Sequence, residues 1–319
     1  MKRRTLFTSL LAAWAAAPLA RAQSGPAIRL IVPYAAGGGG DAVARTIAPS
    51  LGEQLGRSVV VDNRPGANGV VAVQALLGAD LEGGTLMLTD SSVLSINPWI
   101  YKSLRYDPKR DFEPVALVAR GPLFLAVHPK VPAKTFDELV ALARSQPGRL
   151  NYATPGAGST HHLCMEYLKS ALKIDMTHVP FKGASPAMAA LVAGEVDMTL
   201  AALPSLQAMA QSGRVRLLAV NSLNRYARMP DLPAISETIP GFEFASSMGL
   251  VAARGVPRTA LASLSAAATR AAKSPAVVDA FSAMGIEAIG AEMGEYARAI
   301  ASEDERIGRA VRVANLKLD

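Results

Sequence analysis

Two glycine-rich stretches carry the clearest chemical signal in this sequence. The first is AAGGGGDAVAR at residues 35–45, and the second is ATPGAGSTHH at residues 153–162. Each stands between a strand-like run and a helical pattern. The first turn of a helix has backbone N–H groups without intrahelical partners, together with a partial positive charge, so it attracts anions. Because glycine lets an anion approach the backbone closely, two such turns predict a site that grips a carboxylate at one or both ends.

Hydroxyl groups next to the second glycine run could strengthen such a site. Ser159 and Thr160 could each donate a hydrogen bond to a bound anion. The simpler alternative is that Asp41, Ser159 and Thr160 are helix N-caps and that the glycines only form turns. For any single residue the two interpretations are equally good, but the repetition of the whole arrangement favours the anion site.

The first stretch also fits a dinucleotide-binding pattern. Gly37-x-Gly39-x-x-Ala42 lies between a strand and a helix, and Asp62 ends the next strand-like run. An NAD-dependent oxidoreductase is therefore an alternative. This alternative leaves the second stretch unexplained. It also requires a cofactor that is scarce outside the cytoplasm, whereas the N-terminal residues described below predict export.

Other chemistries lack their residue patterns. The adjacent His161 and His162 diverge by about 100° on a helix, so they cannot chelate one metal as an i,i+4 pair would. Neither the nucleophile elbow G-x-S-x-G nor the P-loop pattern occurs. Cys164, the only cysteine, is expected to be a buried small hydrophobe on an apolar helical face. We therefore predict a binding protein with no catalytic residue, no metal and no cofactor.

The N-terminal residues 1–22 have the pattern of an export signal. A basic start is followed by an apolar stretch of about a dozen residues, too short to span a bilayer, and by Ala20-Arg21-Ala22. We predict cleavage after Ala22 and a periplasmic location, with the Sec and twin-arginine routes both open. Cleavage removes four positive charges from a formal net charge of +7 and leaves +3. The remaining basic residues are scattered, which argues against a nucleic-acid partner.

The rest of the chain alternates strand-like runs with amphipathic helical patterns, which is typical of an α/β protein with largely parallel sheets. A Gly-Pro break at 121–122 interrupts this alternation. We predict two lobes, with residues 23–121 and 226–319 forming lobe 1 and residues 122–225 forming lobe 2. Each lobe places a glycine-rich turn at the carboxyl end of a strand, so the cleft between the lobes is the expected ligand site.

Local signals predict several helix boundaries. Pro49 should kink or shorten the helix that follows the first glycine stretch. Thr135 should cap the helix that follows it. Ser185 should cap a later helix that Gly194 ends. Further helices are expected near residues 69–79, 258–273, 275–284 and 291–314.

The sequence resembles a known family over the whole chain after the export signal. The segments that carry the resemblance are, in order, IRLIVPYAAGGGGDAVAR, VVVDNRPGANG, INPWIYKSLRYDPKRDFEPVALVA, VHPKVPAKTFDELVALARSQPGRLNYATPGAGSTHHL, HVPFKGASPAMAALVAGEVDM and GRVRLLAV. They are similar to the tripartite tricarboxylate transporter substrate-binding proteins, also called Bug receptors. The resemblance implies a two-lobed, type 2 periplasmic binding protein fold with an interdomain ligand cleft.

The resemblance also implies a task. The family captures an organic carboxylate and delivers it to a pair of integral-membrane permease subunits, and we expect this chain to do so as a monomer. A receptor that feeds a sensor kinase is an alternative, because its binding lobes would look alike.

The resemblance further implies which residues contact the ligand. The two carboxylate-gripping loops fall on Tyr34 to Asp41 and on Thr154 to His161. The segment after the third strand and the Leu-Pro-Ser turn at 203–205 complete the implied site. The expected ligand-binding residues are Tyr34, Ala36, Gly37, Gly38, Gly39, Gly40, Asp41, Asp90, Ser91, Ser92, Thr154, Gly156, Gly158, Ser159, Thr160, His161, Pro204 and Ser205.

Two departures from the family pattern make the expected site less polar. Gly40 stands where relatives usually have threonine or serine, and Ala201 and Ala202 stand where a polar residue is common. Together with Trp99, which could line the cleft or pack in the core, these changes lead to the hypothesis that the ligand is a longer or aromatic carboxylate.

Overall fold

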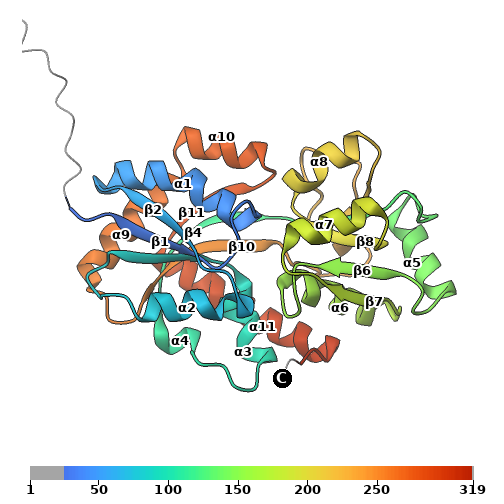
Figure 1. Cartoon of the computed structure of the whole chain (residues 1–319), viewed down its shortest axis with the longest axis horizontal. Coiled ribbons are helices and arrows are strands. Elements are labelled where there is room, and N and C mark those ends of the chain that lie inside the picture. Colours follow the sequence, from blue (N-terminus) through green and yellow to red (C-terminus); the bar gives the residue numbers. More distant parts are fainter. Residues whose placement is uncertain (1–24, 318–319) are drawn as a thin grey trace, which may run out of the picture.

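The computed structural model describes residues 25–317, so the predicted export signal and its cleavage site lie outside the described residues. Two β-sheets lie side by side, each covered by helices, and they define two lobes (Figure 1). The first sheet has six strands in the order β11-β4-β10-β3-β1-β2, and the second has five in the order β7-β6-β8-β5-β9. In the part of the chain that the structure describes, no helix is both long and apolar enough to cross a membrane.

The elements follow the alternation seen in the sequence. The strands are β1 (Ile28–Val32), β2 (Val59–Asn63), β3 (Thr85–Thr89), β4 (Phe112–Gly121), β5 (Phe124–Val127), β6 (Asn151–Thr154), β7 (Thr177–Pro180), β8 (Met198–Ala201), β9 (Arg216–Val220), β10 (Ser246–Ala253) and β11 (Glu287–Glu292). The α-helices are α1 (Gly39–Leu55), α2 (Val70–Leu77), α3 (Asn97–Ile100), α4 (Pro108–Asp111), α5 (Phe136–Ser145), α6 (Thr160–Leu172), α7 (Ala184–Ala193), α8 (Leu203–Gln211), α9 (Arg258–Ala272), α10 (Pro275–Ala283) and α11 (Met293–Ala314). Three short turns complete them, namely η1 (Ala67–Gly69), η2 (Ser92–Ile96) and η3 (Ile235–Glu237).

Both sheets are mixed, which corrects the expectation of largely parallel sheets. In the first sheet β1 is parallel to β2 and β3, but β10 is antiparallel to β3 and β4. In the second sheet β6 is parallel to β7 and β8, but β5 is antiparallel to β8 and β9. The reason is the path between lobes. Strands β5 and β10 enter their sheets from the interlobe side, so they run opposite to the strands that end there.

The return from lobe 2 to lobe 1 lies later than the sequence suggested. The chain leaves the first sheet at Gly121 and enters the second at Phe124. After β9 it stays on the second lobe, where Ala234 bridges to Val220. The side chains of Ile235, Ile239, Phe242 and Phe244 join the main core of that lobe. It re-enters the first sheet only with β10. We therefore propose a lobe boundary near residue 245 in place of the expected 225.

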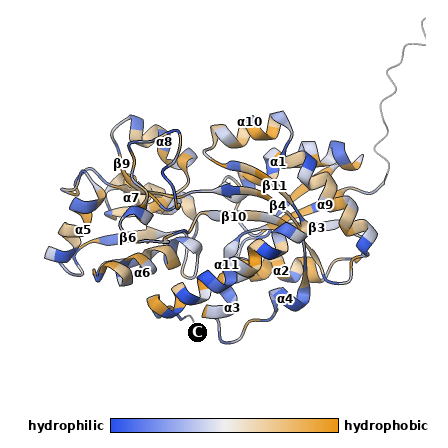
Figure 2. Ribbon diagram, turned by 180° about the vertical axis from the view of Figure 1, so that it is seen from behind, coloured by the Kyte–Doolittle hydropathy of each residue, from blue (hydrophilic) through white to orange (hydrophobic). Residues whose placement is uncertain are grey.

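Helix α11 belongs to both lobes. Near its start, Tyr296 is buried in a core of the first lobe, whereas Ile307 and Val311 are buried in the main core of the second. The helix is amphipathic, with apolar and polar faces visible as orange and blue in Figure 2. The helix packs on the first lobe near its start and on the second lobe near its end, which explains why one apolar stripe runs along its whole length.

Two local expectations were wrong. Helix α1 continues through Pro49 to Leu55, so the proline does not shorten it, and the alternative expectation of a kink stays a prediction. Gly183 stands at the N-cap of α7, and Ser185 lies within the first turn instead. Thr135 caps α5 as expected, because its side chain accepts a hydrogen bond from the Glu138 N–H.

Asn221 ties the two crossovers together. Its side-chain oxygen accepts from the Leu123 N–H at 2.7 Å, and its side-chain nitrogen donates to the Phe244 carbonyl at 2.8 Å. Its backbone N–H and C=O pair with the same two residues. Asn221 is fully buried, so these bonds have no competition from water.

We expect the Asn221→Ala substitution to lower the free energy of unfolding by about 2–4 kcal/mol. The loss follows because it leaves a buried N–H and a buried C=O unpaired at the junction of the lobes. Chemical denaturation followed by circular dichroism measures it, with the exposed Asn224→Ala variant as control. Equal stability of the two variants would show that Asn221 does not pin the crossovers.

Candidate functional site

Parallel strands bring the predicted site segments to one edge of each sheet. The first glycine loop follows β1, and residues 90–92 follow its neighbour β3. In the second lobe the second glycine loop follows β6, and α8 follows its neighbour β8. Both edges face the other lobe, because contacts cross between them. The Ser92 and Thr160 hydroxyl oxygens lie 3.2 Å apart, and the Asn68 side chain donates to the Gly158 carbonyl at 3.0 Å.

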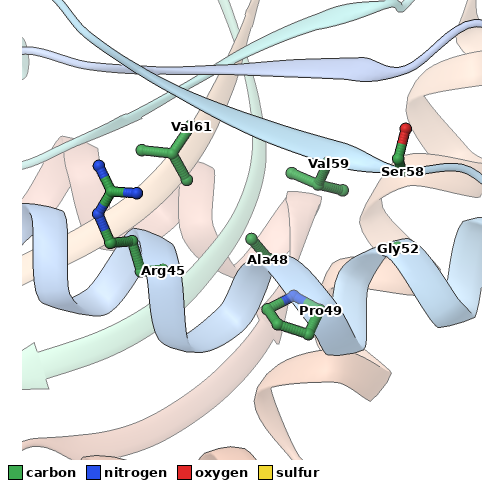
Figure 3. A pocket seen from close by; sticks show the side chains of 7 residues that line it. All are labelled: Arg45, Ala48, Pro49, Gly52, Ser58, Val59 and Val61. Carbon is green, nitrogen blue, oxygen red and sulfur yellow. The ribbon is translucent and has the colours of Figure 1, made fainter.

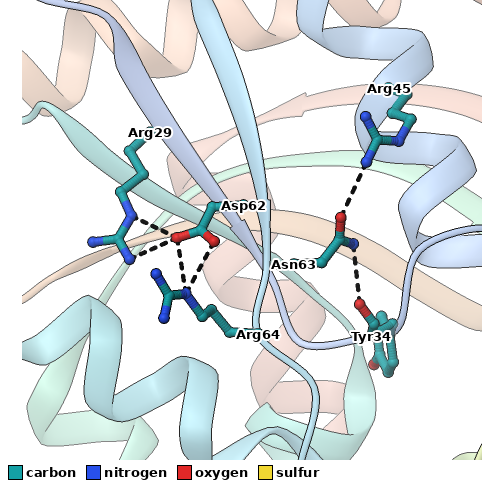
Figure 4. A network of polar contacts seen from close by, with 6 residues as sticks. All are labelled: Arg29, Tyr34, Arg45, Asp62, Asn63 and Arg64. Atoms are coloured by element: carbon teal, nitrogen blue, oxygen red, sulfur yellow. Dashed lines mark hydrogen bonds and ion pairs between the residues drawn. The ribbon is translucent and has the colours of Figure 1, made fainter.

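Asp41 organises the first loop from within. Its carboxylate accepts hydrogen bonds from the Gly37 N–H at 2.8 Å, from the Asn63 side chain at 2.9 Å and from Arg45 at 2.9 Å. Asn63 also donates to the Tyr34 carbonyl, and Arg45 donates to Asn63 (Figure 4). Burial opposes ionisation, but these hydrogen bonds lower the pKa of Asp41. The carboxylate is thus committed to the loop, and only the backbone N–H of Asp41 stays a candidate ligand contact.

The first turn of α1 keeps its backbone donors free. Among the described residues, no protein acceptor pairs with the N–H groups of Gly39, Gly40 or Asp41. Gly39 is exposed, and Gly37 has a φ of +83°, which favours glycine there. A Cβ at Gly40 would overlap the ring of Tyr34. This packing explains in physical terms why this chain has no hydroxyl residue at position 40.

Side chains hold the second loop in the same way. Ser159 caps α6, since its hydroxyl accepts from the His162 N–H at 3.3 Å and donates to the Gly156 carbonyl at 2.8 Å. The Thr154 hydroxyl donates to the same carbonyl at 3.1 Å. The Gly158 N–H donates to His162 Nδ1 at 3.1 Å. In the described chain the N–H groups of Thr160 and His161 have no protein acceptor, so α6 also presents free donors.

A stacked pair of histidines supports the second loop, and sequence reasoning missed it. The rings of His162 and His178 lie 3.8 Å apart and nearly parallel, and the Tyr152 ring also stacks on His178, with 5.0 Å between the ring centroids. His178 Nε2 lies 2.7 Å from the Thr154 hydroxyl oxygen. Burial lowers the pKa of both imidazoles, that of His178 to about 4, so both rings are neutral near pH 7. The only signal available in the sequence was that His178 lies in the strand that directly follows the helix with His162.

The segment after β3 faces two directions. The Ser92 N–H donates to Asp90 Oδ1 at 2.9 Å, which turns the chain into the π-helical turn η2. π-helical turns are rare and are frequently found at functional sites. The Ser91 hydroxyl points away to Glu303 on α11, at 2.6 Å, and burial raises the pKa of Glu303 to about 7. Ser92 therefore faces the other lobe, and Ser91 does not.

Tyr34 and Asp90 form a partly buried polar pair beside Ser92. The Tyr34 hydroxyl has no hydrogen-bond partner of good geometry among the described residues. Burial and then the charge of Asp90 raise the pKa of Tyr34, and burial also raises the pKa of Asp90. These side chains connect the first loop to Ser92, and Ser92 to Thr160, so the two loops adjoin one site.

The other expected residues differ in their exposure. Ala36 is exposed in the first loop, and Pro204 and Ser205 are exposed on the first turn of α8. His161 occupies the first turn of α6, where burial lowers its pKa to about 4. Its imidazole is neutral near pH 7 and adds no positive charge.

Trp99 lies outside the site. Its indole N–H donates to Asp304 at 2.8 Å, its ring covers Gly308, and the Arg312 guanidinium lies over it at 5.2 Å. All three partners belong to α11. The hypothesis that Trp99 shapes a pocket for an aromatic ligand therefore loses its basis.

The structure also bears on the other chemistries. Asp62, the acidic residue of the dinucleotide pattern, is held by Arg29 at 2.6 Å and by Arg64 at 2.9 Å (Figure 4). Its carboxylate is engaged by side chains and is not presented to a ribose. No group of histidine, cysteine and acidic side chains within residues 25–317 could hold a metal ion. Cys164 is buried, and burial raises its pKa, as expected for a structural cysteine.

Two surface cavities on the first lobe contain no residue of the segments 34–41 and 154–161. One, of about 390 Å³, lies between α1 and β2, with Arg45 pointing into it (Figure 3). The other, of about 410 Å³, lies near Lys273 and the start of α11. The candidate site is therefore defined by the two loops and their donors.

Two lobes joined by two crossovers, with the starts of α1 and α6 at the sheet edges where contacts cross between the lobes, define the class of two-lobed periplasmic binding proteins. The model of the tripartite tricarboxylate transporter family receptor matches residues 43–316. The chain belongs to this family of solute-binding proteins, which confirms the resemblance drawn from the sequence and the expectation that it is not an enzyme.

Relatives of known structure share the whole architecture. A protein of R. palustris solved with adipate is 31% identical, with a TM-score of 0.87 over 92% of this chain and 99% of that one. MatC from Rhodopseudomonas palustris, with bound malate, is 30% identical, with a TM-score of 0.83 over 90% and 99%. Among relatives known by sequence, protein BugT from Bordetella pertussis is 32% identical over 91% of this chain and 90% of its own length. The predicted two-lobed α/β fold is confirmed.

We expect the contribution of His178 to the free energy of unfolding to fall by roughly 2 kcal/mol as the pH decreases from 6.5 to 4. His178 binds a proton near pH 6.5 when unfolded but only near 4 when folded. The unfolded state therefore binds more protons in this window, and stability is lost as the pH falls.

His178→Gln should reduce this pH dependence, because glutamine can keep the hydrogen bond to Thr154 without titrating. Urea denaturation at several pH values measures the slope, and His128→Gln serves as the control. An unchanged slope for His178→Gln would contradict the role assigned to the stacked pair.

Proposed function

We propose that this protein captures an organic carboxylate between its lobes, in the periplasm, and delivers it to membrane permease subunits of a tripartite tricarboxylate-type transporter. The observation that carries the proposal is the pair of unpaired helix starts. Gly39 and Gly40 on α1, and Thr160 and His161 on α6, have free backbone donors on adjoining sheet edges. Anions bind such donors, and the family's receptor description names the partner class.

The donor set indicates how the carboxylate would be held. Side chains expected to grip the ligand are largely committed to the loops, as for Asp41, Ser159 and Thr154. The contacts left for a ligand are backbone N–H groups, the Tyr34 hydroxyl, which has no partner among the described residues, and the hydroxyls of Ser92 and Thr160, which lie 3.2 Å from each other. Backbone donors recognise the carboxylate itself and leave the rest of the ligand to the shape of the site.

Adipate and malate are the first ligands to test, because relatives of this chain hold them. Both are dicarboxylates, so each could offer one carboxylate to each helix start. Capture would then follow by closure, with the ligand favouring the closed arrangement of lobes. Calorimetric titration with adipate, malate and citrate tests the proposal. Binding of none of a broad carboxylate panel would contradict it.

Gly39→Val should weaken carboxylate binding roughly 30- to 150-fold. Nothing lies within 4 Å of a Cβ at Gly39, so valine fits the fold and covers the donors of α1. The magnitude corresponds to the loss of about one hydrogen bond to a charged group. Calorimetric titration measures it.

Gly294→Val is the matched control, because Gly294 is also an exposed glycine in the first turn of a helix. It should bind as the unchanged protein does. Equal affinity of the two variants would show that the start of α1 does not hold the ligand. Thr160→Val tests the second loop in the same way, since it removes the hydroxyl without adding volume.

A further inference from the structure

The turn between β2 and α2 has an unusual backbone. Gly66, Ala67, Asn68 and Gly69 have φ values of +134°, +46°, +47° and +91° in succession. Residues with a Cβ avoid this left-handed region, and such outliers cluster at functional sites. The anion site described above uses none of these residues, so the distortion needs its own explanation.

The distorted turn delivers the Asn68 side chain to the other lobe. Its Nδ2 donates to the Gly158 carbonyl at 3.0 Å and to Asn97 Oδ1 at 2.6 Å. Gly158 belongs to the second glycine loop, so this contact joins lobe 1 to the loop that presents the donors of α6.

A buried network fixes Asn68 in place. Asn97, which is fully buried, donates from its Nδ2 to the Asn68 carbonyl and to the Tyr106 hydroxyl, both at 2.9 Å. Tyr106 donates in turn to the Val93 carbonyl at 2.8 Å. A Cβ at Gly69 would overlap Val93, so the turn is also packed tightly against η2. The amide is therefore positioned by lobe 1 before it meets lobe 2.

We propose that Asn68 is an interlobe latch, a positioning residue that holds the closed arrangement of the lobes. This inference rests on the proposed function, because closure is how the protein would capture its ligand. The contact joins two protein groups and no ligand atom. It should therefore slow the release of every ligand by the same factor, unlike the donors of α1 and α6, which act on the carboxylate directly.

Another polar contact between the lobes is placed differently. Arg228 donates to the Ser282 carbonyl at 2.6 Å on the α8–α10 side of the molecule, where its side chain is exposed. Water competes for that contact, whereas Asn68 is half-buried and anchored by Asn97. The Ser92 and Thr160 hydroxyls also meet across the lobes, but they belong to the proposed ligand site, so the latch is assigned to Asn68.

The test uses Asn68→Gly, which keeps the left-handed backbone and removes only the side chain. We expect the dissociation rates of adipate and malate to rise by the same factor, about 3- to 10-fold, with association rates nearly unchanged. Asn315→Gly is the matched control, because Asn315 also has a left-handed φ, of +51°, at the end of α11. Stopped-flow kinetics measures both variants.

A second measurement needs no ligand. Spin labels at Glu53→Cys on α1 and Ala141→Cys on α5, both exposed, report the distance between the lobes, and the buried Cys164 stays unlabelled. Asn68→Gly should shift the distance distribution toward the open arrangement, and Asn315→Gly should not. An unchanged distribution together with an unchanged dissociation rate would overturn the latch. If the protein bound no carboxylate, the distance measurement would still test the latch, so the two proposals can fail separately.

Discussion

Backbone N–H groups in the first turn of a helix cannot be satisfied within that helix, and the rest of this structure depends on where two sets of them lie. Parallel pairing of β1 with β3, and of β6 with β8, brings the starts of α1 and α6 to the edges where the lobes meet. The antiparallel entry of β5 and β10 turns those edges toward each other. The position of the site is therefore determined by the direction of the strands, and the side chains only shape it.

Side chains around the two loops do a different task from the one that their chemistry first suggests. The Gly37 N–H donates to Asp41 and the Gly158 N–H donates to His162, so one backbone amide in each loop stabilises the loop itself. The amides that follow are left free. A neutral imidazole pair and a paired carboxylate give the site no unpaired formal charge from these residues, so the helix starts themselves supply the positive potential. Binding by backbone amides without an unpaired charged side chain from these residues suits a receptor that must release its ligand as well as bind it.

Local sequence signals predicted what depends on neighbours in the chain. The glycine runs, the caps and the apolar periodicity located α1, α6 and most other helices. The sequence could not show that Trp99 packs on Gly308, or that His178 stacks on His162, because these contacts join separate elements. The return crossover was placed early because residues 226–244 pack on the second core without regular elements of their own beyond η3. The sequence also could not show that the Asp41 carboxylate is held within the first loop, since Asn63 donates to it from another element, β2.

The most direct test of the account is to follow the backbone amides themselves. In ¹⁵N–¹H spectra recorded during a titration with adipate, the amide signals of Gly39 and Gly40 should shift together with those of Thr160 and His161. All four amide signals should saturate with one dissociation constant, because a single ligand molecule would accept hydrogen bonds from both lobes. Shifts confined to one lobe, or two sets that saturate at different concentrations, would contradict the claim that the two helix starts share a single carboxylate ligand.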